Sequence, residues 1–230
     1  DTINIARLGG VTNLKIDNIS VIEITDDTNL PRIDYTDGCG SLLLEGQSTN
    51  LITQSELFSD AYWVKNGLLS ITSGFVSPKG DLSAFKLVEN TSNTSHFLYA
   101  NVSAVGVYTF SVFVKKGERE YVYLYSDAVG KGKSFNLVNG TIDVDIIASP
   151  ISAKIDDYSN GWYRCSMTIN ANSSAFRIGT CLANGNFSYQ GDGTSGIYIY
   201  GASLEQQSYA TSYIPTSGVI STRLADIARR

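Results

Sequence analysis

Few side chains in this sequence have the types and spacing that catalysis needs. The sole histidine, His96, lies between Ser95 and Phe97 in a segment with the composition of a strand. A catalytic histidine needs a nucleophile beside it, and the sequence contains no GxSxG nucleophile elbow. A lone histidine in a strand is typical of a structural residue, so we expect no catalytic role for it.

Paired carboxylates would be needed for the hydrolysis of a glycosidic bond. The sequence has three such pairs that are close along the chain: Glu118/Glu120, Asp143/Asp145 and Asp156/Asp157. Each lies in or beside a predicted turn or loop, where solvated carboxylates are common. We therefore expect the chain not to be an enzyme and to have no catalytic residues. A polysaccharide depolymerase remains an alternative hypothesis.

Metal-binding patterns are sparse as well. An odd number of cysteines without CxxC spacing predicts neither a zinc site nor a disulfide framework. Cys165 is in phase with Met167 and Ile169, which predicts a buried thiol and favours synthesis in a reducing cytoplasm. A structural calcium ion is the one cofactor we consider, although no EF-hand-like spacing singles out its candidate ligands Asp34, Asp37, Glu45 and Asp192.

Aromatic residues give the clearest indication of binding chemistry, since they make up 11% of the chain and include 14 tyrosines. Tyr121, Tyr123 and Tyr125 alternate along one predicted strand, so they share a face at intervals of about 7 Å. Such rings can stack on the C–H face of a sugar while their hydroxyls form hydrogen bonds. A neighbouring subunit or another part of the same domain could also cover them.

The stretch Gly106–Asp127 predicts a hairpin that would position these tyrosines. Its first strand alternates strictly, and Lys116–Glu118 has the composition of a turn. Pairing of the two strands would place Phe113 on the tyrosine face. Val122 and Leu124 match the phase of the core, so we expect the three tyrosines to point away from the domain's own core.

Trp162 and Arg164 form a second candidate pair. Both are out of phase with the predicted core residues Tyr163, Cys165 and Met167. We therefore expect Trp162 and Arg164 to face outward together, where they would suit sugar binding or a subunit interface.

Short strands separated by Gly, Asn, Ser and Asp turns account for most of the chain. Asn139-Gly140 between two of them is a strong hairpin signal. Helical periodicity is limited to one turn at Ser55–Ala61 and a terminal helix at Arg223–Arg230. The pattern predicts an all-β fold, an antiparallel β-sandwich of jelly-roll type with little helix. The further strands we expect are Leu68–Thr72, Leu82–Val88, His96–Val102, Ser134–Val138, Thr141–Asp145, Ile151–Ile155, Gly161–Asn170, Ala175–Leu182 and Ile197–Glu205.

The composition of the whole chain excludes several classes of partner. Its 230 residues suit one large β domain, and 43% hydrophobic against 17% charged residues allow a sizeable core. The net charge is −5 and no lysine–arginine cluster exceeds Lys115-Lys116, so we expect no nucleic-acid partner. No apolar run approaches the ~20 residues of a membrane span, so we expect no membrane insertion.

The sequence predicts four segments. Residues 1–24 contain the long strand Leu14–Ile24 and would close a preceding module or form an N-terminal extension. Residues 25–40 would be a linker, residues 41–222 the β-sandwich, and residues 223–230 a C-terminal tail. The chain starts at Asp1 without a signal-peptide pattern, which predicts a fragment or a processed product.

A family resemblance rests on several segments in a fixed order. They are Leu42–Leu51, Phe113–Arg119, Phe135–Thr141, Asn160–Cys165, and Tyr200–Glu205 with Thr211–Ser217. In this order they resemble the carbohydrate-binding-module-like jelly-roll domain of bacteriophage tail-fibre and other virion-fibre proteins. The resemblance covers residues 41–222, with one departure at Gly46, where the family usually has proline.

This resemblance implies a non-catalytic virion-fibre module that recognises cell-surface polysaccharide of the host. It also implies that the protein is made in the host cytoplasm and then displayed on the exterior of the virion. The family's fibre subunits assemble as homo-oligomers, most commonly trimers, so the resemblance implies other fibre subunits as partners. The alternative is a purely structural fibre or capsid-decoration module whose aromatic face lies at a subunit interface. The candidate carbohydrate-binding residues are Phe113, Tyr121, Tyr123, Tyr125, Trp162 and Arg164.

Overall fold

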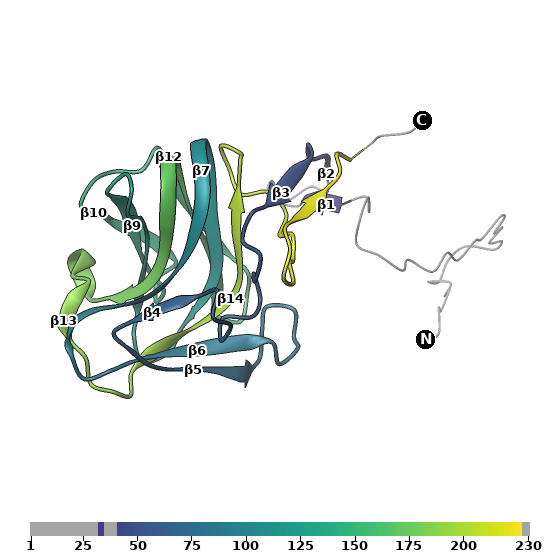
Figure 1. Cartoon of the computed structure of the whole chain (residues 1–230). Coiled ribbons are helices and arrows are strands. Elements are labelled where there is room, and N and C mark those ends of the chain that lie inside the picture. The colour runs from purple at the N-terminus through teal and green to yellow at the C-terminus, as the bar shows by residue number, and fades with distance from the viewer. Residues whose placement is uncertain (1–31, 35–40, 227–230) are drawn as a thin grey trace, which may run out of the picture.

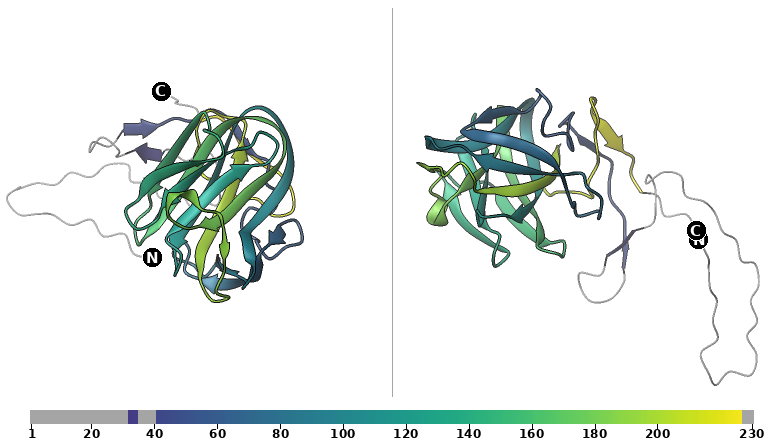
Figure 2. Two further views of the ribbon diagram at one scale, coloured as in Figure 1. Left: turned by 90° about the vertical axis from the view of Figure 1, so that its left-hand side faces the viewer. Right: turned by 90° about the horizontal axis from the view of Figure 1, so that it is seen from below.

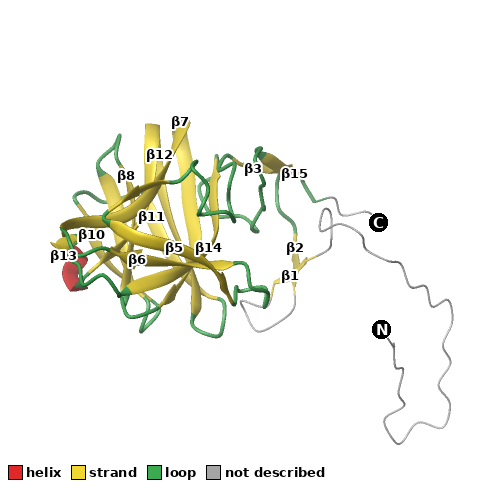
Figure 3. Cartoon of the chain, turned by 60° about the horizontal axis from the view of Figure 1, so that its bottom comes forward, coloured by secondary structure: helices red, strands yellow, loops and turns green. Residues whose placement is uncertain are grey.

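The computed structural model describes residues 32–34 and 41–226, so the expectations for residues 1–24 lie outside it. Within this part the chain is almost wholly β-structure, with one short 3-10 helix, η1 (Ala183–Gly185), beside β13 (Figure 3). The predicted turn of helix at Ser55–Ala61 is a series of turns, and a strand ends at Arg223 where a terminal helix was expected to begin. No helix in the described residues is long and apolar enough to span a membrane.

Fifteen strands are described, and all of their pairings are antiparallel. Eleven of them form one sheet around the longest strand. The strands are β1 (Arg32–Asp34), β2 (Ser41–Leu43), β3 (Ser48–Asn50), β4 (Val64–Asn66), β5 (Leu68–Phe75), β6 (Ala84–Glu89), β7 (Asn93–Lys116), β8 (Tyr121–Ser126), β9 (Lys131–Asn136), β10 (Thr141–Ile146), β11 (Ser152–Asp157), β12 (Trp162–Cys181), β13 (Ser188–Gln190), β14 (Gly196–Glu205) and β15 (Ser221–Arg223).

Two strands, β7 and β12, are much longer than the rest and pair with each other along nearly their whole length. Their ladder is interrupted once, by a register shift between Asn172 and Ser174 of β12. Close to this point β7 contains Gly106 at a φ of 108°, a conformation that glycine adopts readily. A bulge of this kind bends a strand, and the two halves of each long strand therefore belong to different layers.

The two layers are defined here by the strands that pair with these halves. The β8 layer has the order β10-β9-β8, then residues 176–181 of β12, then residues 93–101 of β7, with β4 and β13 at its edge. The β14 layer has β11, residues 162–172 of β12, residues 105–116 of β7, then β14-β6-β5. Figures 1 and 2 show these layers from three sides.

One hydrophobic core fills the space between the layers. It takes Val122 and Leu124 from the β8 layer and Val112 and Ile199 from the β14 layer, all fully buried. Burial of a side chain of this size stabilises the fold by about 1.5–3 kcal/mol, so the core provides most of the favourable free energy. The predicted all-β, antiparallel sandwich is confirmed, while the jelly-roll connectivity stays a prediction.

Of the two hairpins that the sequence predicts, one is present in the structure and the other is not. β9 and β10 form the hairpin expected at Asn139-Gly140, with Gly140 at a φ of 63°. The hairpin expected within Gly106–Asp127 is wrong, because β8 pairs with β9 and β12 and not with β7. The two strands follow each other along the chain but lie in different layers.

Two small sheets stand beside the sandwich at one end (Figures 1 and 2). β1 pairs with β2, and β15 pairs with β3. A buried ion pair, 3.4 Å between Arg223 Nη2 and Glu45 Oε2, joins β15 to the segment before β3. This contact ties the two ends of the described chain together.

Candidate functional site

The tyrosines of β8 lie on the outer face of the β8 layer, as expected from their phase. Tyr123 and Tyr125 pack in a cluster that is separate from the core, together with Phe97, Ile146 and Cys181. Phe113 lies on the outer face of the other layer, because β7 and β8 do not form a hairpin. The candidate residues therefore form two separate groups.

Glycines on neighbouring strands let the tyrosine rings lie flat on the sheet. Gly179 of β12 stands opposite Tyr123, and a Cβ there would come within 2.6 Å of Tyr123 Cζ. Gly132 of β9 stands opposite Tyr125, where a Cβ would come within 2.8 Å of Tyr125 Cδ2. A side chain at either position would occupy the place of the ring.

Tyr123 is too deeply buried for its ring to stack on a sugar. The prediction that it is a carbohydrate-binding residue, made from its place in the alternating pattern, therefore does not fit its position. Tyr123 is 1% exposed, and the Phe187 ring lies over it at 5.7 Å between centroids. Burial raises the pKa of its phenol, so the hydroxyl stays protonated. Tyr121 is half-buried and accepts a hydrogen bond of 3.1 Å from Asn136 Nδ2.

An open hollow of about 250 Å³ lies above this part of the sheet. We call it the tyrosine hollow. Its wall combines aromatic and aliphatic side chains with one ion pair, a composition common in small-ligand sites. The residues that line it are Tyr123, Tyr125, Asp127, Ile146, Ile147, Arg177 and Phe187.

Arg177 and Asp127 bring the polar groups to the hollow. Arg177 Nε donates to Asp127 Oδ2 at 2.9 Å, and its Nη2 pairs with the other carboxylate oxygen. The guanidinium lies 4.1 Å from the centroid of the Phe97 ring and 5.4 Å from that of Tyr125. These contacts fix the plane of the guanidinium, so donors and acceptors are presented side by side with no net charge.

Tyr125 adds a neutral hydroxyl at the same place. Burial first, and then the nearby Asp127 carboxylate, raises the pKa of its phenol. The group therefore keeps its proton at neutral pH and can both donate and accept a hydrogen bond.

Backbone strain is found at the rim of the hollow. Ile147 has a φ of 64°, and Ala148 N donates to Ile146 O at 2.8 Å, which makes Ile147 the centre of a classic γ-turn. This turn is rare and strained, and a β-branched residue makes it more so. It holds a side chain that is 72% exposed at the edge of the hollow. Such strain is often found at binding sites.

The second group of candidates lies on the outer face of the β14 layer and is covered. Trp162 is 2% exposed and Arg164 4%, so the expectation that they are open to solvent is wrong. Arg164 donates to Thr211 O at 2.5 Å and Ser111 Oγ at 3.0 Å, and forms a buried ion pair of 3.7 Å with Glu205. The segment after β14 accepts one of the arginine's hydrogen bonds at Thr211 O, and Ser111 of β7 accepts the other.

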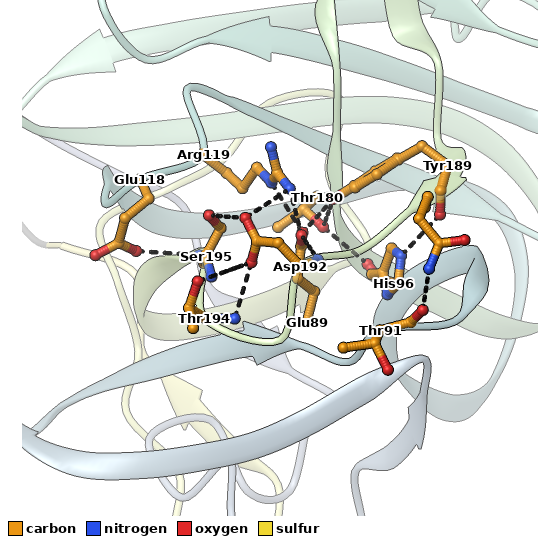
Figure 4. Close-up of polar contacts among 12 residues, drawn as sticks. Glu89, Thr91, His96, Glu118, Arg119, Thr180, Tyr189, Asp192, Thr194 and Ser195 are labelled. Atoms are coloured by element: carbon orange, nitrogen blue, oxygen red, sulfur yellow. Dashed lines mark hydrogen bonds and ion pairs between the residues drawn. The ribbon is translucent and has the colours of Figure 1, made fainter.

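A third polar cluster surrounds Glu89, whose side chain is fully buried (Figure 4). Its carboxylate pairs with Arg119 and accepts hydrogen bonds from Tyr189 Oη at 2.7 Å and Asp192 N at 3.0 Å. Burial raises the pKa of Glu89, but these hydrogen bonds outweigh that effect and lower it overall. The cluster joins the end of β6 to the loops after β7 and β13.

His96 lies in the same region, where both ring nitrogens face backbone oxygens and the ring packs against that of Tyr189 at 4.8 Å between centroids. Nδ1 is 2.5 Å from Gly67 O and Nε2 is 3.1 Å from Tyr189 O. The side chain is fully buried, consistent with the structural position expected of a lone histidine in a strand.

The three acidic pairs considered for hydrolysis each have one member in an exposed ion pair with a lysine. Glu118 pairs with Lys86 at 2.8 Å. The other two ion pairs, also of 2.8 Å, are Asp145–Lys133 and Asp156–Lys154.

The candidate calcium ligands are not gathered in one place within the described residues, where no cluster of three metal-binding side chains occurs. Glu45 accepts from Ser212 N at 2.9 Å near β15. Asp192 accepts from Ser195 N at 2.7 Å in the loop before β14. Asp37 lies outside the described residues.

Sequence reasoning missed Arg177, Asp127, Ile147 and Phe187. Arg177 had a usable signal, because it is the one charged residue in the apolar strand Ala175–Leu182. Asp127 follows Tyr125 by two residues and so continues the tyrosine face. The positions of Ile147 and Phe187 depend on loops whose course no periodicity describes.

No protein-family model and no curated protein sequence matches the chain. Solved structures to which the chain has some similarity include the enzymatically active domain of tailspike protein 4 of bacteriophage CBA120, with a TM-score of 0.38 and 13% identity over 67% of this chain. The chain spans 21% of that tailspike domain.

Two further similar structures come from bacterial enzymes. A carbohydrate-binding module of Cellvibrio mixtus lichenase 5A, in complex with cellotriose, has a TM-score of 0.33 and 11% identity over 69% of this chain and 96% of its own. A Clostridium thermocellum xylanase 10B structure, complexed with xylohexaose, has a TM-score of 0.37 and 16% identity over 75% of this chain and 30% of its own. A function for this chain has to come from its own side chains.

Proposed function

We propose that the chain is a non-catalytic module that binds cell-surface polysaccharide through the tyrosine hollow, as part of a virion fibre. The observation that carries the binding proposal is that Tyr125 and the Arg177–Asp127 pair line one open hollow. The ordered segments described in the sequence support the fibre setting, including display on the virion and recognition of a host.

The chemistry of the hollow suits a sugar without net charge. The Arg177 guanidinium and the Asp127 carboxylate compensate each other, so an extra charge on the ligand would find no partner. Adjacent donor and acceptor groups match the neighbouring hydroxyls of a sugar ring, which both donate and accept. Tyr125 and Phe187 provide apolar surface for the C–H face. A hollow of about 250 Å³ fits a single ring better than a longer segment.

The test begins with a glycan-array screen of the full chain, followed by calorimetry with the glycan that binds. Tyr125→Ala removes the ring and its hydroxyl, and Asp127→Asn removes the charge at nearly constant shape. We expect each variant to bind about tenfold more weakly, which corresponds to about 1.4 kcal/mol. Tyr125→Phe, which removes the hydroxyl alone, should have a smaller effect.

Tyr209→Ala is the matched control, because Tyr209 is an exposed tyrosine that lies outside the tyrosine hollow. Far-ultraviolet circular dichroism should show that all variants remain folded. Unchanged binding in both Tyr125→Ala and Asp127→Asn would exclude the tyrosine hollow as the site.

A purely structural role in a fibre has support from a different surface. Four large apolar side chains are 50–69% exposed beside the β3–β15 sheet: Leu44, Val219, Ile220 and Leu224. We propose that a second copy of the chain covers them in a homo-oligomer, of which a trimer is the form that the fibre resemblance favours. Sedimentation equilibrium tests this, with Val219→Ser/Ile220→Ser expected to yield monomer. A wild-type chain that sediments as a monomer would contradict the assembly.

A further inference from the structure

A second hollowed surface lies on the outer face of the β14 layer. Two hollows of about 200 and 360 Å³ adjoin there and share three lining residues, Val76, Lys115 and Trp162. We call the pair the lysine groove. Trp162 forms its floor, while Phe75 and Tyr198 line one part and Tyr158, which is 45% exposed, lines the other.

The strand register places cations and aromatic rings alternately across this face. Trp162 of β12 pairs with Lys115 of β7, Lys115 pairs with Tyr198 of β14, and Tyr198 pairs with Lys86 of β6. Neighbouring strands are about 4.8 Å apart, so Trp162 and Tyr198 stand about 10 Å apart with Lys115 between them. The row places one ammonium group between two aromatic residues, of which Tyr198 is partly exposed and Trp162 is buried.

Lys115 differs from the other lysines of this surface in lacking an ion pair among the described residues. Lys79 pairs with Glu56 and Asp81, each at 3.5 Å. Lys86 pairs with Glu118 at 2.8 Å. No acidic side chain lines either hollow, although the chain as a whole has a net charge of −5. The groove therefore has one uncompensated positive charge.

The hairpin tip between β11 and β12 forms a fixed rim for the groove. Ser159, Asn160 and Gly161 have φ values of 64°, 52° and 78°, three successive residues in the left-handed region. Backbone hydrogen bonds of 2.8 Å from Tyr158 N to Trp162 O and 2.9 Å from Trp162 N to Ser159 O hold this conformation. The exposed Ser159 and Asn160 place polar groups beside the aromatic floor.

We infer that the lysine groove is a second binding site and that its ligand is an acidic saccharide, a segment of a polymer that contains uronic acid. The more exposed rings of Tyr158 and Tyr198 contact the C–H faces of the sugar, and Lys115 pairs with its carboxylate. This site is independent of the tyrosine hollow, where the charges are already paired and a neutral sugar fits. The two sites lie on opposite outer faces of the sandwich, so one chain can hold two polysaccharide segments.

The test uses a hexamer of galacturonic acid and the same hexamer as its methyl ester, which keeps the rings and removes the charge. Calorimetry with the full chain measures the affinities, and tryptophan fluorescence reports on the site. Of the two tryptophans, Trp162 is in the groove, whereas Trp63 is buried in the core and donates to Gln54 O. Trp162→Phe, a change of ring that keeps the packing, should remove the fluorescence response.

We expect the acid to bind at least fivefold more tightly than the ester and less tightly as salt is added. Lys115→Gln should reduce the affinity for the acid to that for the ester. Lys65→Gln, at an exposed lysine on β4, is the matched control and should bind like the wild type. The Asp127→Asn variant should also bind the acid normally, which separates this site from the tyrosine hollow.

Three outcomes would overturn the inference. One is that the acid does not bind, and another is that acid and ester bind equally to the wild type. The third is that Lys115→Gln binds the acid as tightly as the wild type does.

Discussion

Gly179→Ala tests the packing beneath the tyrosine hollow, because two opposing effects on stability can be compared there. Gly179 has no positive φ, so alanine fits its backbone conformation. By itself the change would stabilise the fold by about 0.4–1 kcal/mol, because alanine lowers the conformational entropy of the unfolded chain. Its Cβ, however, would lie within 2.6 Å of Tyr123 Cζ and 2.7 Å of Tyr123 Oη. The ring cannot move away, since Phe187 covers it.

Overpacking of this kind costs about 1–3 kcal/mol, so the clash outweighs the entropic gain. We expect Gly179→Ala to lower the free energy of unfolding by about 1–2 kcal/mol, measured by urea denaturation with circular dichroism. The melting temperature should fall by about 4 °C in a domain of this size. Gly46→Ala is the control, because a Cβ at Gly46 meets nothing within 4 Å.

A double-mutant cycle identifies the clash as the cause. Tyr123→Leu removes the ring atoms that the new Cβ would meet, so Gly179→Ala in that background should cost nothing. The coupling energy should be at least about 1 kcal/mol. Either of two results would refute the reasoning. One is that Gly179→Ala is as stable as the wild type, and the other is that Gly179→Ala loses the same amount of stability in the Tyr123→Leu background.

Two further predictions concern the buried ions. Arg164→Ala should lower the free energy of unfolding by about 3 kcal/mol, because it leaves Glu205 buried without its cation. Urea denaturation measures this change, and a loss below about 1 kcal/mol would contradict the prediction. The pKa of Glu89 is lower in the folded than in the unfolded chain, so its stabilisation is present above about pH 4.3 and is lost as the pH falls through the folded pKa. The urea concentration at the unfolding midpoint should therefore decrease in the wild type as the pH is lowered from 5 to 3, and it should decrease less in Glu89→Gln. An equal decrease in the two proteins would contradict the prediction.

The sequence allowed good prediction of strands and of the faces they bury. Alternation identified Val122 and Leu124 as core residues, and they are buried. It could not identify which strands pair, because period 2 fixes the face of a strand and not its neighbour. That is why Phe113 was placed with the tyrosines although β7 and β8 lie in different layers.

The candidate site was predicted only in part, for a related reason. Tyr125 was found because it belongs to a regular pattern. Arg177 reaches it from β12, about 50 residues further along the chain, and only the fold brings the two together. The depth at which Tyr123, Trp162 and Arg164 are buried depends on loops and on the C-terminal segment, which alternation within a strand does not describe.

The length of β7 and β12 has a consequence for the kinetics of folding. Their ladder joins residues that are dozens of positions apart in sequence, and both layers are built on it. Neither layer can form before this one long-range pairing, and the entropy of closing such a loop must be lost first. The sandwich should therefore fold slowly and in a single cooperative step, in which both outer faces form together.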